Sequence, residues 1–90
     1  MRPLTDFQLV ILRSLIRANE WRFTRGLVAD MLKEDNYRAS TREAAYQLKL
    51  MERGGLVEKA RKKLSQYGWG WRITKAGIKA AEAADVTLPG

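Results

Sequence analysis

The chain has 90 residues, of which 46% are hydrophobic, an ordinary share for one small globular domain. It contains no cysteine and no histidine, which excludes a disulfide framework, thiolate chemistry, the usual zinc ligands and the commonest general base. The longest aliphatic run, Leu9 to Leu12, is far too short to span a membrane, and the first residues show no signal-peptide core. We therefore expect a cytoplasmic protein without cofactor, metal or membrane association. A single domain should occupy residues 1–84, with a flexible tail over residues 85–90.

The net charge of +7 is distributed unevenly. Residues 38–79 hold eleven basic and three acidic residues, whereas the rest of the chain holds six basic and seven acidic ones. The excess charge therefore lies almost entirely in one segment, which favours a polyanionic partner. The alternative is a solvated basic face that only keeps a small domain soluble.

The first predicted helix begins after Thr5 and runs to about Ala18, because Thr5 and Gln8 form a capping-box pattern. Apolar residues cover most of its circumference, so the helix is either central in the fold or partly buried in a second subunit. Three residues lie opposite the main apolar stripe and form a candidate homodimer surface, with burial inside the monomer as the alternative: Leu9, Leu12 and Ile16.

A short strand at residues 21–23 and a second helix at residues 25–32 follow, with Thr24 as the expected N-cap. Asn36 is expected to adopt a left-handed conformation in the next turn. The inward face of this helix should carry four apolar residues: Leu27, Val28, Met31 and Leu32.

The third helix has the clearest start in the chain, because Ser40 and Glu43 form a second capping box. It should end at Arg53, where Gly54 and Gly55 follow. Its inward stripe consists of Ala44, Leu48 and Met51. The opposite face carries Arg42, Tyr46, Lys49, Leu50 and Arg53.

Two strands, at residues 56–60 and 68–73, should form a hairpin with a long mobile loop over residues 61–67. Trp69 and Trp71 share one face of the second strand. Core packing is the favoured interpretation of both, more firmly for Trp71, and stacking on unpaired bases is the alternative. Thr74 should cap a last helix.

This order of helix, short strand, helix, helix, strand, strand, helix predicts a mainly α-helical (α+β) fold with a small β-hairpin, the winged helix-turn-helix. Two motifs resemble those of MarR- and PadR-type regulators: Leu48-x-x-Met51-Glu52-Arg53-Gly54-Gly55-Leu56-Val57 and Ile73-Thr74-x-x-Gly77-x-x-Ala80. The resemblance covers about residues 24–84 and implies a DNA-binding domain. The chain departs from those families at Gly54, where they usually carry a charged residue, and in lacking their long flanking helices.

A winged helix lays the outer face of such a helix into the major groove of DNA. Arg42 and Tyr46 are best placed to reach base edges, Gln47 could pair with adenine, and Arg53 should meet a phosphate. The helix N-terminus with Ser40 and Thr41 could bind another phosphate. The full set of predicted DNA contacts is Arg38, Ser40, Thr41, Arg42, Tyr46, Gln47, Lys49, Arg53, Lys59, Arg61, Lys62 and Lys63.

The sequence thus favours a duplex-DNA-binding transcriptional regulator that is not an enzyme. Its partners would be double-stranded DNA and either a second copy of the chain or a helper protein. One alternative is a protein-interaction module, an adaptor or inhibitor of a nucleic-acid enzyme, and another is nonspecific nucleic-acid binding. The one acidic cluster that could support catalysis consists of Asp30, Glu34 and Asp35. It could bind a cation weakly, but it is better explained as a solvated helix end.

Overall fold

The computed structural model describes residues 3–61 and 68–87 of the chain. Its three strands form an antiparallel sheet in the order β1-β3-β2. This is the winged-helix architecture that the sequence predicts. The elements in chain order are α1 (Asp6–Ala18), β1 (Arg22–Phe23), α2 (Thr24–Asp35), α3 (Thr41–Arg53), β2 (Val57–Lys59), β3 (Gly70–Ile73) and α4 (Lys75–Thr87).

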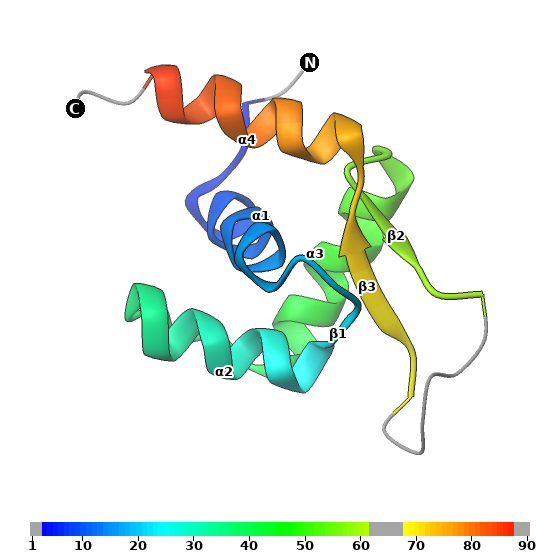
Figure 1. The fold of residues 1–90 in the computed structure, drawn as a ribbon. Helices are drawn as coiled ribbons and strands as arrows, with labels where there is room; N and C mark the ends of the chain where they lie inside the picture. Colours follow the sequence, from blue (N-terminus) through cyan, green and yellow to red (C-terminus); the bar gives the residue numbers. More distant parts are fainter. Residues whose placement is uncertain (1–2, 62–67, 88–90) are drawn as a thin grey trace.

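Helix α1 lies at the centre of the molecule, as Figure 1 shows with α1 seen nearly end-on between α4 and α2. It contacts α2, α3, α4 and β3. Its capping box is present as predicted, with the Thr5 hydroxyl accepting from the Gln8 amide. Because the helix is surrounded, Leu9 and Leu12 are only 8% and 0% exposed. The suggested dimer surface is therefore wrong at these two positions, and only Ile16, at 40%, is exposed.

Helix α2 differs from the prediction at its start and on one face. Thr24 is already helical, and Phe23 occupies the N-cap position without a side-chain hydrogen bond. The reason is that β1 leads directly into the helix, which leaves no turn in which Thr24 could act as a cap. Leu32 is 45% exposed rather than buried, because it lies one residue beyond the buried Met31 and is rotated away from the core. The left-handed conformation of Asn36 is confirmed by its φ of 51°.

Helix α3 begins and ends where the sequence predicts. The Ser40 hydroxyl accepts from the Glu43 amide, and the Ser40 amide donates to the Glu43 carboxylate, each at 3.0 Å. At the other end, Gly55 takes the positive φ of 77° while Gly54 stays right-handed. The inward stripe of Ala44, Leu48 and Met51 is at most 2% exposed. Burial of this stripe fixes which face of α3 remains free.

The capping box of α3 predicts a loss of stability on the acid side. Hydrogen bonding to the Ser40 amide, and then to its hydroxyl, lowers the pKa of Glu43 below its ordinary value of 4.5. Because the folded pKa lies below the unfolded one, this contribution is present above pH 4.5 and is lost as the pH falls through the folded pKa. We expect Glu43→Gln to remove that part of the pH dependence of thermal unfolding. Identical pH profiles for the wild type and the variant would contradict this expectation.

One face of the sheet packs against the helices, and the core covers only part of it. Val57 pairs with Ile73 and Lys59 pairs with Trp71, and these residues share the face turned toward the helices. Trp71 is 4% exposed, which confirms its core packing. Trp69 is 37% exposed, so the core assignment is wrong there: Trp69 precedes the first residue of β3, where the core no longer covers the sheet. The expected mobile loop falls mainly on residues 62–67, outside the described residues.

Helix α4 is joined tightly to the end of α3. The Thr74 hydroxyl accepts from the Gly77 amide at 3.0 Å, as the predicted cap requires, and donates to the Gly55 carbonyl at 2.6 Å. The helix continues to Thr87, past the residue where a tail was expected to begin, and residues 88–90 lie outside the described part of the chain. Within the described ranges, no helix is both long and apolar enough to cross a membrane.

Candidate nucleic-acid interface

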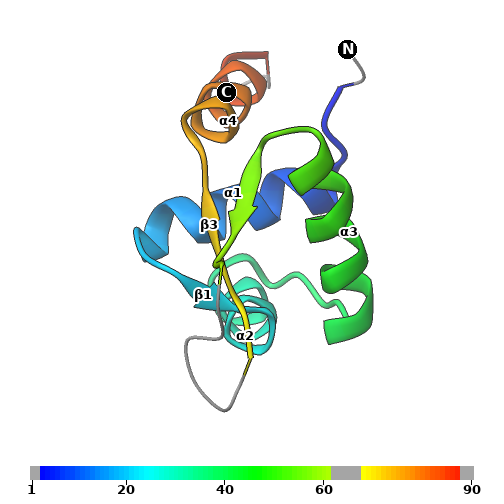
Figure 2. The same ribbon diagram turned by 90° about the vertical axis from the view of Figure 1, so that its right-hand side faces the viewer.

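Among the described residues, no other helix or strand covers the outer face of α3. In Figure 2, α3 runs along one edge of the molecule, with α1 behind its inner side. Tyr46 is 61% exposed and Leu50 is 37% exposed. Arg42, Lys49 and Arg53 are exposed beside them. The structure therefore brings together the whole outer stripe that the sequence predicts for α3.

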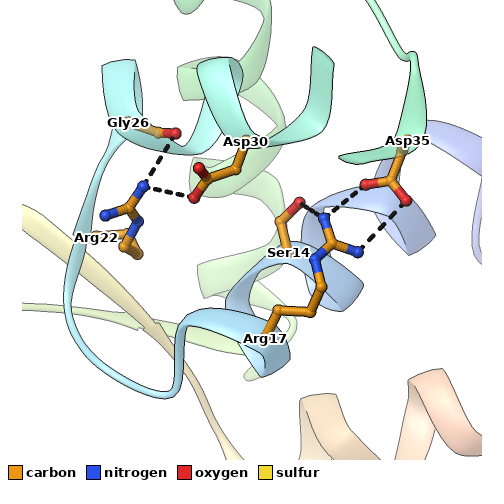
Figure 3. A network of polar contacts seen from close by, with 6 residues as sticks. All are labelled: Ser14, Arg17, Arg22, Gly26, Asp30 and Asp35. Atoms are coloured by element: carbon orange, nitrogen blue, oxygen red, sulfur yellow. Dashed lines mark hydrogen bonds and ion pairs between the residues drawn. The ribbon is translucent and has the colours of Figure 1, made fainter. Parts of the chain in front are cut away.

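The ion pairs of the described residues lie away from this face. Arg17 of α1 contacts Asp35 at 2.7 Å, and the same guanidinium donates to Ser14 at 3.0 Å (Figure 3). Its hydrogen bond with Asp35 raises the pKa of Arg17 above its ordinary value. Two further pairs are Arg22–Asp30, also drawn in Figure 3, and Arg72–Glu58. In the described part of the chain, no basic side chain of α3 is used in an ion pair.

These same pairs account for much of the acidic cluster. Asp30 and Asp35 each face an arginine from another element, so their charges are paired within the protein rather than forming an open cation site. Among the described residues, no three acidic side chains gather in a way that could hold a metal ion.

One predicted base contact is occupied by a contact inside the protein. The Gln47 side chain is half-buried, and its carbonyl oxygen accepts a hydrogen bond from Gln8 of α1 at 3.2 Å. Bidentate pairing with adenine needs both the carbonyl and the amide group. The structure therefore argues against Gln47 as an adenine reader, because α1 holds it on the flank of α3.

The remaining predicted contacts are exposed or lie outside the described residues. Around the start of α3, Arg38, Ser40 and Thr41 are exposed, although the Ser40 hydroxyl already caps the helix. Lys59 and Arg61 are exposed at the base of the wing, whereas Lys62 and Lys63 are outside the described ranges.

A groove of about 630 Å³ lies between the wing and the helices. We call it the wing-base groove; it is formed by the first turn of α2, the first residue of α3 and the adjoining ends of the hairpin strands. Sequence reasoning missed Arg25, which is exposed at this groove. The signal was weak, since a basic residue in the first turn of a helix opposes the helix dipole and has no evident structural role there.

A model of the ribonuclease R winged-helix domain matches residues 9–80, which is most of the chain. The chain belongs to the ribonuclease R winged-helix domain family. None of the curated proteins is similar enough to be counted as a relative.

Several solved winged-helix structures resemble this family member. RosR from H. salinarum is 25% identical with a TM-score of 0.77, and the match covers 97% of this chain and 76% of RosR. F93 from STIV, a winged-helix DNA-binding protein, is 14% identical with a TM-score of 0.79, covering 94% and 89%. A MarR family protein from Bacillus stearothermophilus is 21% identical with a TM-score of 0.72, covering 94% of this chain and 54% of that protein. At the two lower identities the likeness shows the fold alone. The family is named after a ribonuclease, whereas F93 is described as a winged-helix DNA-binding protein.

Proposed function

We propose that this winged-helix domain binds duplex DNA as a non-enzymatic transcriptional regulator. Helix α3 would enter the major groove, and the basic wing would follow the phosphate backbone. The observation that carries the proposal is that the outer face of α3 combines exposed basic side chains, none of them in an ion pair among the described residues, with an exposed tyrosine. A DNA phosphate binds more strongly to a basic side chain that is not already paired with a carboxylate.

The arrangement along α3 suggests different roles for its two ends. Arg42 and Tyr46, on the first two turns, would reach base edges, and Arg53 at the last turn would meet a phosphate. The free amide groups in the first turn of α3, next to Arg38, would contact a phosphate of the DNA backbone. Bound alone, a module of this size covers only about 600–1,000 Å² of its own surface. Useful affinity would therefore come from a dimer on two half-sites or from a partner protein.

Two substitutions on α3 test the specific part of this proposal. Arg42→Ala combined with Tyr46→Ala should relax sequence preference, because side chains that touch base edges carry the sequence information. Removal of each base contact should reduce discrimination by about 1–3 kcal/mol. Competition binding with a preferred and a scrambled duplex measures this change.

A matched control separates recognition from general damage. Leu32→Ala also truncates an exposed side chain on a helix, but on α2 instead of α3. The Leu32→Ala variant should leave the preference for the DNA sequence unchanged. If the α3 double variant also leaves affinity and preference unchanged, the basic face does not meet DNA, and an acidic protein surface becomes its better partner.

A further inference from the structure

The wing-base groove has an aromatic wall that the core does not require. Two tryptophans line the groove: Trp71 is 4% exposed, whereas Trp69, two residues earlier on the same side of the chain, is 37% exposed. An indole that keeps more than a third of its surface in water contributes less to the core than its neighbour does. Its exposed surface is therefore available to a partner.

The rim of the groove is cationic. Arg25 from α2 and Lys59 from β2 line it, and none of the described residues that line it is acidic. The Lys59 ammonium lies 5.0 Å from the ring centroid of Trp69 and 5.8 Å from that of Trp71. A positive charge held against an aromatic wall matches a ligand that has a flat ring and a nearby negative charge. An unpaired nucleotide in a strand has both.

The groove also adjoins the proposed DNA interface. Thr41, the first residue of α3, is part of its lining, so the groove opens beside the end of α3 that would read bases. A strand that leaves a duplex held by α3 would meet the groove without leaving the protein surface. Its volume of about 630 Å³ falls within the usual range for small-ligand sites.

We infer that the wing-base groove binds an unpaired nucleotide of a nucleic-acid strand, with the base stacked on Trp69 and its phosphate near Arg25 and Lys59. This inference rests on the proposed function, since duplex binding by α3 delivers the strand to the groove. The protein then prefers a duplex that ends in, or opens into, a single strand over a continuous duplex.

Three matched probes test the inference in equilibrium binding assays with the full chain: a blunt duplex, the same duplex with a short single-stranded extension, and the same extension made of abasic nucleotides. We expect the extension with bases to bind roughly five- to hundredfold more tightly than the blunt duplex. The abasic extension keeps the phosphates but cannot stack, so it should recover little of this gain. Equal gains from both extensions would overturn the inference, because charge alone would then explain them.

Variants at the aromatic wall locate the effect. Trp69→Ala should abolish the gain from the extension while blunt-duplex affinity stays the same, and Trp69→Phe should retain most of the gain. Trp21→Ala is the matched control, because Trp21 packs under Arg72 at 4.4 Å and does not line the groove. A gain that survives in Trp69→Ala would also overturn the inference. Thermal unfolding of each variant shows that the comparison is made between folded proteins.

The same assay separates the two proposals. If the blunt duplex binds and the extension adds nothing, the groove inference fails while duplex recognition stands. If blunt-duplex binding is absent but the extension binds through Trp69, duplex recognition fails, and only the binding of an unpaired nucleotide in the groove remains. If a free nucleoside monophosphate competes for the groove as strongly as the extension does, the occupant is a free nucleotide and not a strand, which would overturn the inference.

Discussion

Gly77→Ala is expected to lower the free energy of unfolding by about 3 kcal/mol or more, enough to leave a domain of this size largely unfolded on modest heating. A Cβ atom at Gly77 would lie 2.1 Å from the Leu56 carbonyl oxygen and 2.7 Å from Cγ1 of Ile73. The nearest obstacle is backbone, so it cannot rotate away. The gain of up to about 1 kcal/mol that alanine brings to a helix is too small to offset this overlap. Thermal or urea unfolding monitored by circular dichroism measures the effect.

Gly26→Ala is the matched control for that substitution. Gly26 also lies near the start of a helix, but a Cβ atom at this position would meet only the end of the Arg22 side chain, at 3.1 Å. A guanidinium group can move by a few tenths of an ångström, so we expect a change in stability within about 1 kcal/mol. If Gly77→Ala is as stable as Gly26→Ala, then α4 does not pack against the Leu56 backbone as closely as the structure shows.

A pair of charge-matched variants should differ strongly in DNA affinity. Arg42→Gln with Arg53→Gln removes two exposed cations of α3, whereas Arg17→Gln with Arg72→Gln removes two arginines that are ion-paired within the protein. Both lower the net charge from +7 to +5. We expect only the α3 variant to bind DNA more weakly than the wild type, by about ten- to hundredfold. Its salt dependence should become shallower by about 0.9 log units for each phosphate that is no longer neutralised.

The control pair tests whether total charge or its location matters. The exposed Arg72–Glu58 pair contributes little to stability. Arg17 also contacts the partly buried Asp35 and the buried Ser14, so Arg17→Gln with Arg72→Gln should lower stability modestly but remain folded, which thermal unfolding verifies. Equal reductions of affinity in the two double variants would mean that the protein attracts DNA through net charge without a defined contact face.

The helix boundaries were predictable because their signals are local. The capping boxes at Thr5 and Ser40, the glycine stop after Arg53 and the cap at Thr74 each involve residues within a few positions of one another. The winged-helix order follows from these boundaries. The structure also gives the spacing from Thr74 to Gly77 a physical reason, since α4 passes too close to Leu56 for any side chain at Gly77.

The errors arose where a distant element decides the environment of a residue. Leu9 and Leu12 are buried because other helices and β3 enclose α1, and helical periodicity alone does not reveal how many sides are covered. Gln47 is held by Gln8, which is 39 positions away. Trp69 is exposed because the core does not extend as far as the residue that precedes β3, although its spacing from Trp71 predicts the same face of the strand. The wing-base groove, built from separate segments of the chain, has no signature in the sequence.

Selection of the wild-type protein on a random duplex library at about 150 mM salt, read by sequencing, is the most direct test of duplex recognition by α3. Light scattering on the same sample gives the oligomeric mass. An enriched motif is expected, palindromic if the protein is a dimer, and absent for Arg42→Ala with Tyr46→Ala. No enrichment, with binding that disappears as salt rises, would contradict specific recognition and leave DNA as a nonspecific partner.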